Sequence, residues 1–255
     1  MKKIIALFTL VLTLFTFSSC YGKKESPLEN ETLALTDEEM LITGVVCSGA
    51  RTNSLLVSSE KYGMLDVDIS SAEFKSGEIT SFKDVKNGMT VSFSCTEIME
   101  TYPGMTSATQ ITADTSSYLG DLYGLYCEVI KEMWENDSAL NDNGENLYLN
   151  VPFTPEISSE VIDALAYYTG NLTGKIVTLA TIDDLKEQKI FDESALYING
   201  GCYLEIKGEF SSDNKMTFNV QKYVGGLGAV FYTDCTAEMQ SDGTWEYEIG
   251  GFAIA

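Results

Sequence analysis

The sequence predicts two domains, a small all-β barrel over residues 40–114 and an α+β domain over residues 115–255. Three observations predict this division. Short strand-like segments separated by turn residues fill the first region, a helical period begins at Tyr118, and strand-like alternation returns from Tyr203 onward. The composition, with 44% apolar residues, 21% charged residues and four prolines, is that of an ordered globular chain.

Residues 1–19 are predicted to be an export signal. Lys2 and Lys3 precede an apolar run that ends at Phe17 and is too short for a stable bilayer span. The run closes in Phe17-Ser18-Ser19-Cys20, which resembles the lipobox of bacterial lipoprotein precursors, although Phe17 stands where an aliphatic residue is usual. The resemblance implies lipid attachment at Cys20 and anchoring of the chain on the extracytoplasmic face of the cell membrane. An ordinary secretory signal with an incidental cysteine is the alternative.

Residues 20–39 are predicted to be the lipid anchor and a solvated tether, because they lack a sustained apolar period.

The whole chain carries 38 acidic and 16 basic side chains, a net charge of -22, and contains no histidine. This charge repels polyphosphate, so nucleic acid is not an expected partner. The lack of histidine excludes Ser-His-Asp and Cys-His nucleophiles, histidine-ligated zinc and a histidine general base.

Five cysteines remain once Cys20 is assigned to lipid, and an odd number cannot all pair within one chain. They are Cys47, Cys95, Cys127, Cys202 and Cys235. Two bridges, one within each domain, are conceivable, but no C-x-x-C pattern is present, and free cysteine often behaves as a small core residue. Buried thiols are therefore the preferred interpretation.

Five strands are predicted in the first domain from β-branched and aromatic residues bounded by turns. They are Leu41 to Cys47, Ser54 to Ser58, Met64 to Ile69, Thr90 to Cys95 and Ala108 to Thr112. Lys86-Asn87-Gly88 supplies a tight turn before the fourth strand. Together with residues 44–46, 84–91 and 100–104, this arrangement resembles small OB-like β-barrel modules of Gram-positive bacterial lipoproteins, and the resemblance implies a fold without implying a chemistry.

Three helices are predicted next. Apolar residues at three- and four-residue steps predict the first helix from Tyr118 to Met133. Thr154 is expected to cap a second helix that Gly170 ends, and Thr181 opens a short third helix that reaches Lys189.

Four alternating segments then predict an antiparallel meander. They are Tyr203 to Phe210, Lys215 to Tyr223, Ala229 to Ala237 and Thr244 to Ile249. This order of elements is loosely similar to the cystatin-like and nuclear-transport-factor-like families, which implies a helix packed on a curved sheet. No catalytic motif of these families is recognisable in the sequence.

The segment from Lys222 to Gly228 is the one candidate site. Its three glycines, Gly225, Gly226 and Gly228, allow close backbone approach, and Lys222 and Tyr223 add a cation and an aromatic ring, which predicts the lip of a ligand site. A bulge or wide hairpin turn is the competing interpretation. Neither the phosphate-loop nor the dinucleotide pattern fits these glycines, and the Asp137–Glu145 segment lacks calcium-loop register, so no metal and no cofactor is predicted.

Two functions are compatible with these sequence features. The first is a membrane-anchored interaction module that binds an extracytoplasmic protein or small ligand, since no catalytic constellation is recognisable in the sequence. The second is a histidine-free enzyme that uses a pair of carboxylates, or an Asp, Glu or Tyr acid and base in a cavity. That enzyme requires a desolvated carboxyl with a raised pKa. The sequence therefore favours the binding module and leaves the enzyme as its alternative.

Overall fold

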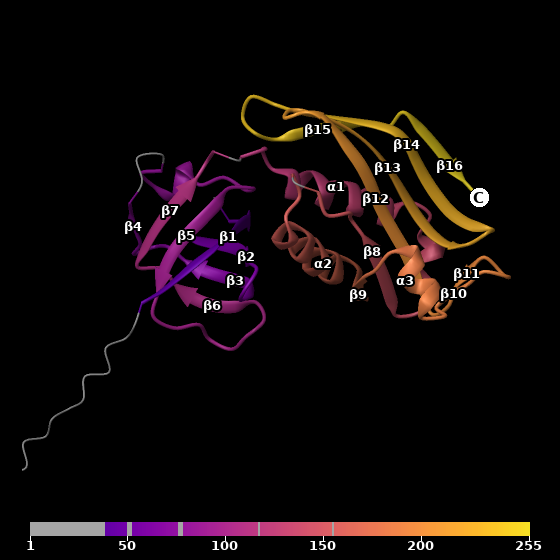
Figure 1. Ribbon diagram of the computed structural model, residues 1–255, viewed down its shortest axis with the longest axis horizontal. Helices are drawn as coiled ribbons and strands as arrows, with labels where there is room; N and C mark the ends of the chain where they lie inside the picture. Colours follow the sequence, from indigo (N-terminus) through magenta and orange to yellow (C-terminus); the bar gives the residue numbers. More distant parts are fainter. Residues whose placement is uncertain (1–38, 50–52, 76–78, 117, 155) are drawn as a thin grey trace, which may run out of the picture. The chain divides into compact units, whose positions relative to one another are not determined.

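The computed structural model describes residues 39–49, 53–75, 79–116, 118–154 and 156–255. This part of the chain is mostly β, with two sheets and three α-helices, and the described residues belong to one compact unit (Figure 1). The predicted signal, Cys20 and all of the tether except Glu39 lie outside the described residues.

The first sheet contains seven strands in the order β4-β7-β5-β1-β2-β3-β6. They are β1 Met40–Ser48, β2 Ser54–Ser59, β3 Gly63–Asp68, β4 Glu73–Phe74, β5 Thr90–Cys95, β6 Gly104–Ser107 and β7 Gln110–Asp114. All five predicted strands are present, the last of them shifted by two residues, and Gly88 has the positive φ of +83° that its turn requires. The short strands β4 and β6 were not predicted.

The predicted closed barrel is not found among the described residues. The two strands at the ends of the order, β4 and β6, each pair with one neighbour, β4 with β7 and β6 with β3, and both pairings are parallel. The sheet is therefore open, although its buried residues, such as Val57, Leu65 and Phe93, form a core of their own on one face.

The second sheet is mixed rather than purely antiparallel. Its strands are β8 Asn146–Asn150, β9 Ile176–Leu179, β10 Phe191–Asp192, β11 Tyr197–Ile198, β12 Gly201–Ser212, β13 Lys215–Gly225, β14 Gly228–Met239, β15 Trp245–Glu248 and β16 Gly251–Ile254. The predicted meander corresponds to β12 through β15. Strands β8 and β9 are joined through a helix and pair in parallel, and β8 also pairs in parallel with β12, an arrangement that needs such a crossover.

The first helix, α1 Leu122–Glu135, begins four residues later than predicted. The Asp121 carboxylate caps it by accepting a hydrogen bond from the Gly124 N–H at 2.8 Å. The predicted start at Tyr118 is wrong, because Gly120 has a φ of +73°, which lies outside helical geometry.

The second helix, α2 Ser159–Thr173, follows Ser158 and ends at Gly174, so the predicted cap at Thr154 and stop at Gly170 are both wrong. Thr154 instead forms a bridge to Ile157. The third helix, α3 Ile182–Glu187, has the predicted cap, since Thr181 and Asp184 form a reciprocal capping box.

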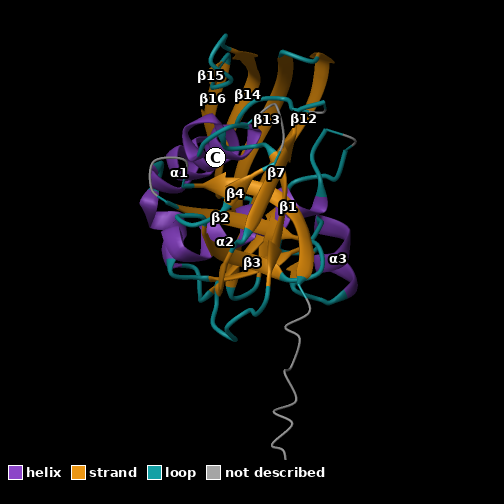
Figure 2. Cartoon of the chain, turned by 90° about the vertical axis from the view of Figure 1, so that its left-hand side faces the viewer, coloured by secondary structure: helices purple, strands orange, loops and turns teal. Residues whose placement is uncertain are grey.

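The helices cover opposite faces of the second sheet. Helices α1 and α2 pack on the face that carries Leu147, Leu204 and Val230, whereas Leu185 of α3 packs with Tyr148 and Tyr203 on the other face. Three residues of the first sheet, Val45, Cys47 and Met64, also enter the core beneath α1 and α2. Figure 2 shows β12, β13 and β14 continuing past α1 at one end.

All five cysteines of the described chain are free and buried, which confirms the preferred interpretation. Burial raises the pKa of the Cys47 thiol to about 12 and that of Cys202 to about 11. These thiols are therefore neutral core groups at physiological pH.

The outer side of β14 is covered in two pieces. β15 pairs with Thr236 to Met239, and β16 pairs with Val230 to Thr233. Between the pieces, Asp234 adopts a positive φ of 52°, and its N–H donates to the Asn219 side-chain oxygen at 2.9 Å, which marks a bulge. Gly250 lies against this bulge, where an added Cβ would stand 2.5 Å from the Asp234 carbonyl oxygen.

Candidate functional site

The three glycines of the predicted ligand lip form the turn between β13 and β14. Gly225 pairs with Gly228, and the register shifts between Tyr223 and Gly225, so the bulge of the competing interpretation is present. None of the three has a positive φ. Added Cβ atoms at Gly225 and Gly228 would stand 2.9 Å from the Tyr197 ring and 3.0 Å from Leu140, so these glycines permit close packing within the chain.

Lys222 points away from this turn and into the protein. Its side chain is completely buried, and its ammonium donates to the carbonyl oxygens of Trp134 at 3.3 Å and Asp137 at 3.1 Å, to that of Asn136, and to the Asn141 side chain at 3.1 Å. Burial lowers the pKa of this ammonium. Because these carbonyls lie at the C-terminal end of α1, Lys222 stabilises the negative end of that helix.

The other polar groups near the turn are also engaged. The Tyr223 hydroxyl donates to the Leu196 carbonyl oxygen at 2.6 Å, on the face opposite to Lys222. The buried Tyr232 accepts a hydrogen bond from the Asn136 amide at 3.0 Å. The predicted lip residues therefore do not converge on one space, and a ligand role for the glycine turn stays a prediction.

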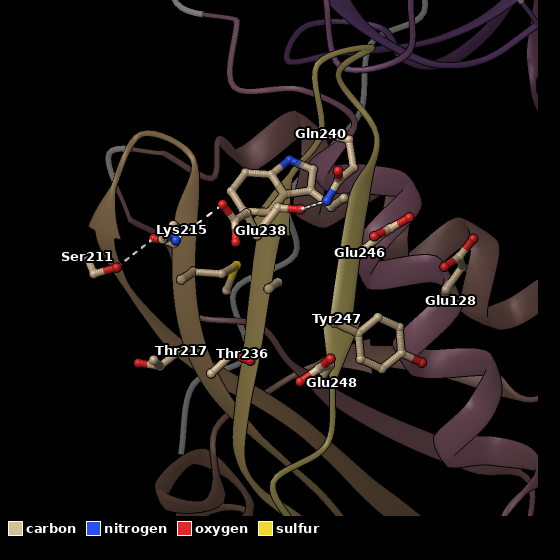
Figure 3. A pocket seen from close by; sticks show the side chains of 13 residues that line it. Glu128, Ser211, Lys215, Thr217, Thr236, Glu238, Gln240, Glu246, Tyr247 and Glu248 are labelled. Atoms are coloured by element: carbon tan, nitrogen blue, oxygen red, sulfur yellow. Dashed lines mark hydrogen bonds and ion pairs between the residues drawn. The ribbon is translucent and has the colours of Figure 1, made fainter.

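A different hollow lies at the end of the sheet that extends past α1. This acidic hollow has a volume of about 760 Å³. It is lined by Glu128, Ser211, Lys215, Met216, Thr217, Thr236, Ala237, Glu238, Gln240, Trp245, Glu246, Tyr247 and Glu248 (Figure 3). Four glutamates and one lysine give its lining an excess of negative charge.

The strand register explains why these charges lie together. Lys215, Glu238 and Glu246 stand opposite one another on β13, β14 and β15, and Thr217, Thr236 and Glu248 form the next row. Residues that pair directly across neighbouring strands point to the same face. The only ion pair among the described lining residues joins Lys215 to Glu238 at 3.2 Å, which leaves the other three glutamates without a basic partner in this part of the chain.

Two aromatic residues of β15 fix the wall of the acidic hollow. Trp245 is buried, and its indole N–H donates to the Leu119 carbonyl oxygen at 2.8 Å. The Tyr247 hydroxyl donates to the Glu132 carboxylate of α1. Burial, and then the hydrogen bond to Glu132, raise the pKa of Tyr247, so the phenol stays neutral and holds β15 against α1.

The acidic hollow is suited to bind positively charged groups. Its carboxylates are exposed, they lie on two neighbouring strands and one helix, and hydroxyl and amide groups stand between them. Within the described residues, no group of three His, Cys, Asp or Glu side chains is arranged to hold a metal ion. Sequence reasoning missed this site, because Glu246 and Glu248 show only a spacing of two residues until the register places Glu238 beside them.

Comparison of the chain with protein-family models, with curated proteins and with solved structures gave no significant match. In the part of the chain that the structure describes, no helix combines the length and apolarity needed to span a membrane.

Proposed function

We propose that this protein is a lipid-anchored, extracytoplasmic interaction module whose acidic hollow binds a positively charged segment of a partner protein. The row of carboxylates across β14 and β15 carries the proposal, since it places several negative charges within reach of one extended basic segment. The net charge of -22 would further speed association with a basic partner.

The first prediction concerns the acidic hollow. Changing Glu246 and Glu248 together to glutamine is expected to weaken binding of an octalysine peptide by about tenfold, because each exposed charge pair contributes up to about 1 kcal/mol. Fluorescence anisotropy of the labelled peptide measures this at low salt, and added salt should weaken wild-type binding.

The matched control changes Glu187 and Glu193 to glutamine. Both side chains are exposed near α3, on the opposite face of the sheet, and the control has the same net charge as the test variant. Equal loss of peptide binding in the two variants would show that net charge alone attracts the peptide, and it would contradict a role for the acidic hollow.

The anchoring part of the proposal is supported by the basic start, the apolar run and the Ser18-Ser19-Cys20 ending of the first twenty residues. Replacing Cys20 by alanine is expected to release the protein from the membrane fraction of the producing bacterium and to remove the mass of the lipid. Fractionation and mass spectrometry measure both. Unchanged membrane retention together with an unchanged mass would contradict lipid attachment at Cys20.

The proposal gives residues 40–114 the role of a spacer between the anchor and the binding domain. Their likeness to OB-like modules, and the boundary near residue 114, remain predictions that rest on the five recognised strands and the Gly88 turn. The seven strands form an open sheet and do not close into a barrel.

The enzymatic alternative requires a carboxyl with a raised pKa. Among the described carboxyls only Asp163 has one, raised by burial and then by the charge of Glu160. Asp163 stands on the exposed side of α2, and the residues that share its cleft include no other carboxylate. Asp163 therefore has no second carboxylate in its cleft with which to form an acid–base pair, and binding is the function that we propose.

A further inference from the structure

A second cleft lies between α2 and the loop that precedes β6. It has a volume of about 460 Å³, within the range of small-ligand sites. From α2 it receives Asp163, Tyr167, Gly170 and Asn171, which share one face of the helix by their spacing, and Tyr102 comes from the opposite loop. This tyrosine cleft shares no lining residue with the acidic hollow.

Two aromatic rings form a corner in the tyrosine cleft. The ring centroids of Tyr102 and Tyr167 are 5.4 Å apart, and the ring planes meet at 78°. The Tyr102 side chain is otherwise largely free, with 75% of the residue exposed. An edge-to-face pair of this kind holds the two rings in a defined orientation and leaves ring surface available to a ligand.

The charge in the tyrosine cleft is negative and unbalanced. None of the described residues that line it is basic, and Asp163 has no ion pair within the described chain. Burial, and then the charge of the neighbouring Glu160, raise the pKa of Asp163. A cation placed beside Asp163 would relieve both effects.

We propose that the tyrosine cleft binds an organic ammonium group, with the cation resting on the Tyr102 and Tyr167 rings and beside the Asp163 carboxylate. Aromatic faces attract cations through their quadrupole, and quaternary ammonium groups suit such sites because they are large, weakly hydrated and unable to donate N–H hydrogen bonds. The wall is low on the side of Gly63, where an added Cβ would meet nothing within 4 Å. Gly63 therefore leaves room for a methyl group of the ligand.

The test uses choline as the probe and the full-length protein without its signal. Choline binding is followed by isothermal titration and by chemical shift changes of the choline methyl protons. Changing Asp163 to asparagine or Tyr102 to alanine is expected to weaken choline binding by about three- to fivefold each, since a cation–aromatic contact or a charge pair at an exposed site contributes up to about 1 kcal/mol. Changing Tyr102 to phenylalanine should preserve binding, because the ring is retained.

Two further arms make the outcome decisive. The variant with Glu246 and Glu248 changed to glutamine should bind choline as the wild type does, so failure of the acidic hollow and failure of the tyrosine cleft are distinguishable. Phosphatidylcholine vesicles distinguish a lipid headgroup from a free ammonium compound, and binding of either supports the shared chemistry. No choline or vesicle binding by the wild type, or equal choline binding after loss of Tyr102 and Asp163 in variants that melt like the wild type, would overturn the proposal.

Discussion

Replacing Lys222 by methionine is expected to lower the free energy of unfolding by about 1 to 3 kcal/mol, the range for leaving buried acceptors without their donor. Methionine fills much of the same space, so the loss comes from the ammonium. Without it, the carbonyl oxygens of Trp134 and Asp137 at the end of α1 have no donor from β13. Chemical denaturation monitored by circular dichroism measures the change.

Lys215 provides the matched control for this experiment. It lies on the same strand, but its side chain is exposed and makes only the surface ion pair with Glu238, so its change to methionine should alter stability by less than about 0.5 kcal/mol. An unchanged denaturation midpoint for the Lys222 variant would contradict the helix-capping role and would restore Lys222 as a candidate ligand residue.

Raising the pH above 9 is expected to destabilise the protein steeply. Burial raises the pKa of Cys47 to about 12 and that of Cys202 to about 11, whereas both titrate near 9 in the unfolded chain. A group whose folded pKa is raised gives its full stabilisation below the unfolded value and loses it as the pH rises toward the folded value. By pH 11 the titration of each of these two thiols should have lowered the free energy of unfolding by about 2 to 3 kcal/mol.

Buried tyrosines act in the same direction. Burial, followed by the charges of Asp121 and Asp242, raises the pKa of Tyr118 to about 12, and burial raises the pKa of Tyr123 and Tyr126 as well. Tyrosinate absorbance near 295 nm should therefore appear together with unfolding rather than before it.

Melting curves in reducing buffer between pH 7 and pH 11 test the alkaline transition. Changing Cys202 to alanine should make the decline shallower, because one titrating thiol is removed. A melting temperature that stays constant from pH 8 to pH 10.5 would contradict the assignment of these thiols and phenols as buried neutral groups.

The sequence predicted the long hairpins well, because β12, β13 and β14 alternate in polarity over many residues and their turns contain Gly, Asn and Asp. It did not predict β8 and β9, which are five and four residues long. β8 is held by pairing with β12, and β9 is held by pairing with β8. Helix ends were misplaced because Gly120, with a φ of +73°, lies outside the helix, and because Gly174, with a φ of +67°, closes α2 in place of Gly170.

The sites were harder to predict than the fold. Lys222 continues the alternation of the buried residues Met216, Phe218 and Val220, so its burial could have been predicted from the sequence. Its helix-capping role could not. The acidic hollow depends on strand register, and the tyrosine cleft joins residues 65 positions apart through tertiary packing. Neither group of residues forms a motif that can be recognised in a short stretch of sequence.

The divided covering of β14 bears on self-association. β15 and β16 are each four residues long, and Gly250 and the Asp234 bulge separate them. A strand from another molecule that approached this side of the sheet would find no long, flat row of free backbone groups, and it would meet a change of direction after four residues. The edge is therefore poorly suited to growth by strand addition, which protects the protein against polymerisation when many copies are crowded together.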